Sequence, residues 1–163
     1  MSAFSNPALK TLLSVGGTIN GMSPFIAMVT KSESRAAFIK SAISFLHTHN
    51  FDGLNLAWEY PGHNGSSEED KGRFTLLVME LSKAFEADAK EKRKTKLLLS
   101  ANVAALRPTI DKAYEVSKIS LYFDLINVMS YDYHGDWEAA TGHNSPLYRS
   151  SVDSGSHIHY NIV

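Results

Sequence analysis

The chain has 163 residues, of which 44% are apolar and 20% are charged, a composition typical of a folded globular protein with one domain. Sixteen Lys and Arg residues against seventeen Asp and Glu residues leave a formal net charge of −1, so we expect neither a nucleic-acid nor a membrane partner. Cysteine is absent, which excludes disulfides and thiolate metal sites, and we recognise no membrane-spanning stretch and no signal peptide in this chain.

The first predicted elements are a strand over 11–17 and a helix after it. The strand is apolar and ends in the pair Gly16-Gly17, which suggests backbone held close to another group. Ser32 is placed to cap the helix. Its apolar residues recur at helical spacing and are Ala36, Ile39, Ala42, Ile43 and Leu46.

A second strand is predicted over 51–61, where Pro61-Gly62 would stop it. The sequence Ser66-Ser67-Glu68-Glu69 is typical of a capping box and predicts the start of a second helix. The buried stripe of this helix is predicted to be Phe74, Leu77, Val78, Leu81 and Phe85.

The remaining predicted elements are a strand over 96–103, a short helix over 116–123, a strand over 125–131 and a loop-like end. Alternating strands and helices indicate an α/β fold with a parallel sheet. Four such units amount to half of a (β/α)8 barrel, whose complete form takes about 250 residues. Periodicity alone leaves two readings open, a small open sheet or a piece of a larger barrel.

Alternation along the second strand separates an apolar set from an inward set: Leu54, Leu56 and Trp58 against Asn55, Ala57 and Glu59. Glu59 stands at the carboxyl end of the strand, where barrels place catalytic groups. A glutamate without further context is more often a surface or salt-bridged carboxylate, so a catalytic role for Glu59 depends on the surrounding motifs.

The segment from Phe51 to Gly62 resembles the signature of the chitinases of glycoside hydrolase family 18, Asp-Gly-x-Asp-x-Asp-x-Glu. Residues 14–17 resemble that family's Ser-x-Gly-Gly strand, and residues 129–138 resemble its sixth-strand motif. Residues 141–147 are similar to animal chitinases and chitinase-like lectins. The resemblance implies an α/β fold that is a partial (β/α)8 TIM barrel, about strands 3 to 6, with residues 1–163 forming an incomplete catalytic-type domain.

The resemblance also implies a mechanism. Glu59 lies where the family's general acid protonates the glycosidic oxygen, and the 2-acetamido oxygen of the substrate attacks the anomeric carbon. A carboxylate two residues before the acid orients that acetamido group, but here the position is Ala57. The loss of one such group typically costs on the order of 10² to 10³ in rate. Asn55 replaces a further aspartate, so negative charge is lost at two inward positions.

Other site residues are implied by the same resemblance. Tyr131 would hydrogen-bond the acetamido group and Asp132 would assist it. Sugar contacts are implied for Tyr60, Met129 and Trp137, although core packing explains Met129 as well, and a cover for the barrel rim explains Trp137 as well.

The glycines and Asp52 have simpler alternatives. Gly16 and Gly17 would let a sugar approach the backbone, but a tight turn explains them equally. Thr18 stands where active members commonly have a tryptophan. The substitution removes a stacking surface and is expected to weaken the binding of a sugar chain. Asp52 begins the signature strand, and a structural hydrogen-bonding role is expected for it.

We therefore predict a chitinase-like protein that binds chitin or N-acetylglucosamine oligomers, with hydrolysis lost or strongly impaired. The alternatives are a weakly active chitinase using Glu59 and a non-functional truncated fragment. No cofactor or metal is expected, because the histidines of the pairs His47-x-His49 and His157-x-His159 would not share a helix face, and no cluster of acidic or sulfur ligands accompanies them. Asn64 begins a possible glycosylation motif, and the family resemblance implies an extracellular location.

Overall fold

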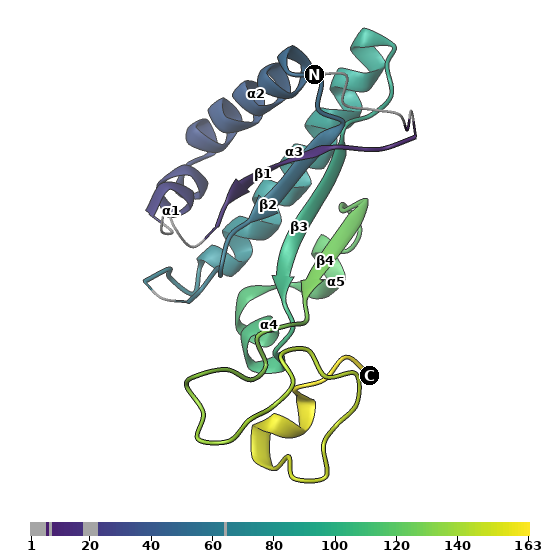
Figure 1. Ribbon diagram of the computed structural model, residues 1–163. Helices are drawn as coiled ribbons and strands as arrows, with labels where there is room; N and C mark the ends of the chain where they lie inside the picture. The colour runs from purple at the N-terminus through teal and green to yellow at the C-terminus, as the bar shows by residue number, and fades with distance from the viewer. Residues whose placement is uncertain (1–5, 7, 18–22, 64) are drawn as a thin grey trace.

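The computed structural model describes residues 6, 8–17, 23–63 and 65–163, and its centre is a parallel four-stranded sheet (Figure 1). The strands are β1 (Leu12–Gly16), β2 (Gly53–Ala57), β3 (Leu98–Ala104) and β4 (Leu125–Met129). They pair in chain order, each with its neighbour in parallel. The predicted α/β class is confirmed, with β1 and β4 as the two edges of the sheet.

The predicted strand ranges extend past the observed ones at one end or both. The largest excess is after β2, where the prediction continued to residue 61. Pairing with β1 ends earlier, because Gly17 N–H donates to the Ala57 carbonyl oxygen at 2.7 Å and β1 has already ended at Gly16. Residues 58–61 therefore lie outside the strand.

Two helices connect β1 to β2, α1 (Ser23–Thr30) and α2 (Ser32–Thr48). The predicted helix corresponds to α2, but the predicted cap is wrong, because Ser32 is its first helical residue and Lys31 before it makes no side-chain cap bond. No helix was predicted at α1. Its eight residues span about two turns, too few for the apolar spacing to repeat clearly.

The helix after β2 is α3 (Asp70–Lys92), and the predicted buried stripe is confirmed in full. The predicted capping box is wrong. The Ser66 hydroxyl and the Ser67 N–H both donate to the Asp70 carboxylate, at 2.7 and 3.0 Å. The bond from Ser67 N–H to Asp70 is the one that the acidic residue of a capping box accepts, so half of a box is present one residue later than predicted.

Two short helices connect β3 to β4, α4 (Arg107–Ala113) and α5 (Val116–Ile119). The sequence predicted one helix over 116–123 and missed α4. The apolar pattern beyond Ile119 has another cause, since Tyr122 and Phe123 pack against the core from non-helical backbone.

The hydrophobic core lies between the helices and the outward face of the sheet. Leu54, Leu56 and Trp58 are 2% exposed or less, as their alternation predicted. Phe25 of α1 stacks on Trp58 with ring centroids 5.3 Å apart, and Phe74 of α3 meets Trp58 edge-on at 6.0 Å. Each large buried side chain contributes about 1.5 to 3 kcal/mol, so the core fixes which residues of β2 point the other way.

The chain after β4, residues 130–163, is called the C-terminal segment here. It is loop-like, as predicted, apart from the 3-10 turn η1 (Gly155–His159). Figure 1 shows it gathered beyond the ends of β3 and β4. Tyr133 N–H donates to the Asn144 carbonyl at 3.0 Å, and the Ser145 hydroxyl donates to the Ser130 carbonyl at 2.6 Å. These bonds fold the segment back onto the end of β4.

Candidate functional site

Asn55 is the centre of a polar ladder on the inward face of the sheet, made of Ser14, Asn55, Ser100, Asn102 and Asn127. Its amide nitrogen donates to Ser14 Oγ at 3.0 Å and to Asn102 Oδ1 at 3.2 Å. Its amide oxygen accepts from Ser100 Oγ at 2.7 Å and from Asn127 Nδ2 at 3.1 Å. All four hydrogen bonds of a buried amide are made with neutral partners. The members on β3 and β4 were not identified from the sequence, although alternation along those strands would have identified them.

Ala57 follows on the same face and is 5% exposed. The neighbouring backbone of β1 is close: a Cβ at Gly16 would lie 2.3 Å from the Ala57 carbonyl oxygen and 2.6 Å from the Phe25 ring. Gly16 also has a φ of 112°, a conformation that other residues rarely adopt. Backbone packing is therefore enough to require a glycine at position 16.

Glu59 opens onto a cavity of about 250 Å³ at the carboxyl ends of β2, β3 and β4, called the Glu59 cavity here. Five of the predicted site residues line it together: Glu59, Tyr60, Met129, Tyr131 and Asp132. The other lining residues come from the end of β3, α4 and the C-terminal segment: Ala104, Ala105, Leu106, Thr109 and Tyr133. Gly16, Gly17 and Trp137 do not line it.

Two phenols lie near the Glu59 carboxylate. Burial raises the pKa of Tyr60, and the negative charge of Glu59 adds to that shift. Burial also raises the pKa of Tyr114 strongly, and its hydroxyl oxygen accepts a hydrogen bond from Ala104 N–H at 3.3 Å. Both phenols therefore stay protonated at neutral pH. Tyr114 was not identified from the sequence, since no motif contained it.

The residues at the end of β4 are more open. Tyr131 is 51% exposed, which leaves its ring accessible from the Glu59 cavity. Asp132 has a left-handed backbone with φ 56°, and its Oδ1 accepts a hydrogen bond from Asn144 Nδ2 at 2.7 Å. One oxygen of the Asp132 carboxylate is therefore already engaged by the C-terminal segment.

Asp52 lies at the opposite end of the sheet from the Glu59 cavity, where the strands begin. Its carboxylate accepts from Thr11 N–H at 2.9 Å and from Lys10 Nζ at 3.0 Å. The Thr11 N–H, followed by the Lys10 ammonium, lowers the pKa of this carboxyl group. Asp52 thus ties the start of β2 to the start of β1.

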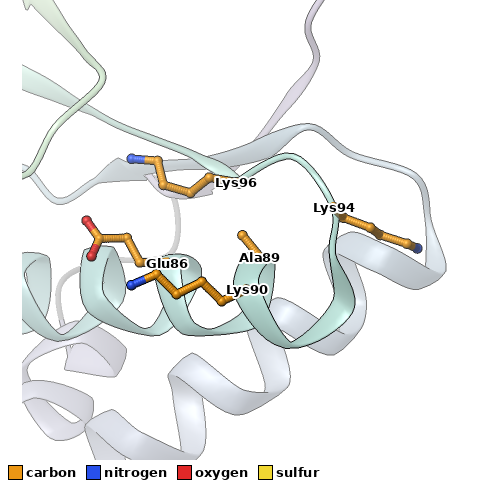
Figure 2. Close-up of a pocket in the computed structure, with 5 residues that line it drawn as sticks. All are labelled: Glu86, Ala89, Lys90, Lys94 and Lys96. Atoms are coloured by element: carbon orange, nitrogen blue, oxygen red, sulfur yellow. The ribbon is translucent and has the colours of Figure 1, made fainter.

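A second depression lies at the same end, where α3 ends and the chain leads into β3 (Figure 2). Figure 2 shows its lining residues, Glu86, Ala89, Lys90, Lys94 and Lys96. Lys96 is paired with Asp124 at 2.9 Å. Barrels place their chemistry at the carboxyl ends of the strands, so this depression is not the candidate site.

Several predictions fall elsewhere. Thr18 and Asn64 lie outside the described residues. His47 Nε2 pairs with the Asp88 carboxylate at 2.7 Å, and His157 lies in η1. Within residues 6, 8–17, 23–63 and 65–163, no group of three or more His, Cys, Asp or Glu side chains could hold a metal ion. No helix in this part of the chain is long and apolar enough to cross a membrane.

Comparisons with known proteins give one consistent result. The model of glycosyl hydrolases family 18 matches residues 1–162. Chitotriosidase-1 of Mus musculus is 49% identical over 157 residues, which cover 96% of this chain and 34% of the mouse protein. The chain therefore spans about a third of the length of that relative.

Solved structures agree with the sequence comparison. An immunomodulatory active chitinase from Trichuris suis superposes with a TM-score of 0.89 at 41% identity, covering 96% of this chain and 41% of that one. Human YKL-39, described as a pseudo-chitinase with retained chitooligosaccharide binding, superposes with a TM-score of 0.87 at 46% identity. It covers 96% of this chain, and the match takes in 42% of YKL-39.

Proposed function

Because the chain belongs to glycosyl hydrolase family 18, we propose that it binds chitin or N-acetylglucosamine oligomers through the Glu59 cavity, with hydrolysis lost or strongly impaired. The observation that carries this proposal is the methyl group of Ala57. It is buried on the inward face of β2, two residues before Glu59.

Glu59 is the proposed general acid. The carboxyl group is half-buried and reaches the cavity together with Tyr60 and Tyr131. When Glu59 protonates the glycosidic oxygen, the bond from that oxygen to the anomeric carbon breaks and the rest of the oligomer leaves as an alcohol. The 2-acetamido oxygen of the substrate bonds to the anomeric carbon in its place, which gives a cationic cyclic intermediate that water later opens. The acetamido group then needs a negatively charged partner that accepts its N–H. A methyl group does neither, so Ala57 leaves the cationic intermediate without its stabilising charge.

Asn55 supports the same proposal. An aspartate at position 55 would bring a second buried negative charge, whereas the observed amide is fully satisfied by the polar ladder. Neutral partners surround it, so the inward face of β2 contains no carboxylate before Glu59. The polar ladder is therefore matched to a neutral side chain at position 55.

Binding needs fewer of these groups than hydrolysis does. Met129, Tyr131 and Asp132 line the cavity beside Tyr60, and the half-exposed Tyr131 ring is open to a ligand. We propose that Tyr131 and Tyr60 donate hydrogen bonds to the sugar. The pseudo-chitinase YKL-39, with its retained chitooligosaccharide binding, supports a binding role, and the active chitinase from Trichuris suis supports the enzyme alternative.

A weakly active chitinase is the second candidate, and the presence of Glu59 in the cavity favours it. A non-functional fragment is the third outcome to be tested, since residues 1–163 cover 34% to 42% of the relatives described above. We also propose an extracellular location, because the family resemblance implies one.

The test compares the unchanged chain with Ala57→Asp, Glu59→Gln and the double variant. We expect the unchanged chain to bind chitin beads without releasing fluorescent product from a labelled chitobiose substrate. Ala57→Asp should raise product release by on the order of 10² or more over the unchanged chain. The double variant, Ala57→Asp with Glu59→Gln, is the control. The gain in product release must disappear in it, because a glutamine at position 59 cannot act as a general acid.

Each other outcome contradicts the proposal in a different way. No gain in Ala57→Asp would refute the account of the defect. Product release by the unchanged chain that Glu59→Gln abolishes would favour the weak chitinase. Absence of both binding and release, with broad unfolding and aggregation, would favour the fragment.

A further inference from the structure

The strands β2 and β3 part at their carboxyl ends, next to the Glu59 cavity. Pairing of β2 with β3 stops at Leu56 and Ala101, whereas pairing of β3 with β4 continues to Ala104 and Met129. The last residues of β3 therefore have a strand neighbour on one side only. Ala104 is the last of them, and it lines the cavity.

The Ala104 N–H points to the side that β2 has left. Leu98 N–H donates to the carbonyl of Asp52, just before β2, at 2.9 Å. Every second residue of a parallel strand bonds to the same neighbour, so Ala104 N–H, six residues later, points to that side as well. The carbonyl that a continued ladder would offer it is that of Trp58, six residues after Asp52. Because β2 ends at Ala57, a different acceptor is required.

Tyr114 supplies this acceptor. Its hydroxyl oxygen accepts from Ala104 N–H at 3.3 Å. Tyr114 is 5% exposed, and its ring packs on Phe74 of α3 with centroids 5.8 Å apart. Its backbone forms the C-cap of α4, where Tyr114 N–H donates to the Ile110 carbonyl at 3.0 Å. The core and α4 thus hold the side chain, and its hydroxyl takes the place that a neighbouring strand would have.

Tyr114 does not line the Glu59 cavity but bonds to Ala104, which does. Burial raises the pKa of Tyr114, and the negative charge of Glu59 adds to that shift. The phenol is therefore neutral and close to the acid. A neutral hydroxyl holds Ala104 in place without adding a charge beside Glu59.

We propose that Tyr114 is a positioning residue: its hydroxyl replaces the Trp58 carbonyl as the partner of Ala104 and keeps β2 and β3 apart where Glu59 reaches the cavity. This inference rests on the proposed function, because the separation affects binding only if the cavity takes N-acetylglucosamine oligomers. Tyr114 acts through Ala104 and the path of the chain after β2, and it has no contact of its own with the sugar.

The first measurement needs no sugar and follows the exchange of amide hydrogens by nuclear magnetic resonance. Tyr114→Phe keeps the ring and removes the acceptor. The ring still fills the space beside Ala104, so the Trp58 carbonyl cannot replace the hydroxyl, and exchange at the Ala104 amide should become about tenfold faster. Unchanged or slower exchange at Ala104 would overturn the positioning role, and so would an equal acceleration at amides throughout the chain.

Tyr122→Phe is the matched control. The Tyr122 ring also packs against the core, but it does not line the Glu59 cavity. The same atom is removed, and exchange at the Ala104 amide should stay as it is in the unchanged chain. Faster exchange at Ala104 in this control as well would mean that any loss of a buried hydroxyl loosens β3, which would overturn the specific role of Tyr114.

The second measurement is calorimetric binding of chitotetraose to the full chain. Tyr114→Phe should weaken this binding about fivefold, because the end of β3 no longer holds its place in the cavity wall, and Tyr122→Phe should leave it unchanged. Circular dichroism should show both variants folded at the temperature of the measurement, so that a loss of affinity does not reflect a loss of folded protein. Equal losses in the two variants would overturn the proposal.

The two measurements separate the two failures. If the unchanged chain binds no chitotetraose, the proposed function fails, and the role of Tyr114 in binding fails with it, whatever the exchange rates show. If the unchanged chain binds chitotetraose and Tyr114→Phe loosens the Ala104 amide without weakening that binding, the positioning role alone fails.

Discussion

The strands β2 and β4 contribute to the same cavity but are held very differently. All five residues of β2 are buried, whereas four of the five in β4 are exposed. β2 pairs with a strand on each side and packs against the helices, while β4 pairs with β3 at the edge of the sheet. The position of Glu59 is therefore set by the hydrophobic core. Tyr131 and Asp132 depend on the sheet and on a few bonds from the C-terminal segment.

The largest expected loss of stability follows from shortening an apolar side chain of β2, and the same change in β4 is the comparison. Leu56 is fully buried, and Val128 is 53% exposed. Leu56→Ala should lower the free energy of unfolding by about 2 to 5 kcal/mol, because it leaves a cavity in the core. Val128→Ala should change it by less than about 0.5 kcal/mol. Urea unfolding measures both, and losses of similar size would contradict the contrast between the strands.

The same contrast explains how much of the fold was predictable. Leu54, Leu56 and Trp58 follow the period of two, and α3 follows the period of 3.6, because burial on one face imposes those periods. The helices α1 and α4 are too short for a period to show. The capping box failed for a different reason, since Asp70 rather than Ser66 organises the helix start.

The candidate site was predicted in part. The motifs named Glu59, Tyr60, Met129, Tyr131 and Asp132, and parallel strands bring their carboxyl ends to one edge, which is why these residues share a cavity. Sequence motifs do not report which side chains bond to one another across strands. The polar ladder around Asn55 therefore required coordinates.

The second prediction compares the carboxylates that follow the two strands. Asp70 is fully buried and accepts from Arg73 Nη1 at 2.9 Å, whereas Asp132 is exposed and accepts from Asn144. Asp70→Asn should lower the free energy of unfolding by about 1.5 to 3 kcal/mol, the range for hydrogen bonds to charged groups. Asp132→Asn should cost about 0.5 kcal/mol, since water replaces the lost contact.

The stability difference between the unchanged chain and Asp70→Asn should depend on pH, in a direction set by the pKa of Asp70. Burial alone would raise the pKa of Asp70, but the hydrogen bonds from Arg73, Ser66 and Ser67 outweigh it and lower the pKa. The contribution of the carboxylate is then fully present above its unfolded pKa of about 3.9 and is lost as the pH falls through the folded value. Chemical unfolding at pH 7 and in acid should show the difference between the two chains shrinking in acid. A difference that grows in acid would contradict the assignment.

The third prediction restores charge to the polar ladder. Asn55→Asp replaces a donor to Ser14 Oγ and Asn102 Oδ1 with an acceptor. The Ser14 hydroxyl is able to rotate and donate, but the Asn102 amide must turn over, which breaks its 3.4 Å bond from Asn127. We expect a loss of about 1 to 3 kcal/mol in the free energy of unfolding at pH 7.

Asn127→Asp is the matched control, because Asn127 donates to the same Asn55 oxygen from the exposed strand β4. Water solvates a carboxylate there, so the cost should stay below about 1 kcal/mol. At position 55 burial raises the folded pKa of the new carboxyl group, so its cost is absent below the unfolded pKa of about 3.9 and grows as the pH rises toward the folded value. A loss equal in the two variants, and independent of pH, would contradict the contrast between the buried and the exposed position. A loss confined to Asn55→Asp at neutral pH would mean that the interior of β2 is built around a neutral amide, since the charged form alone is disfavoured there.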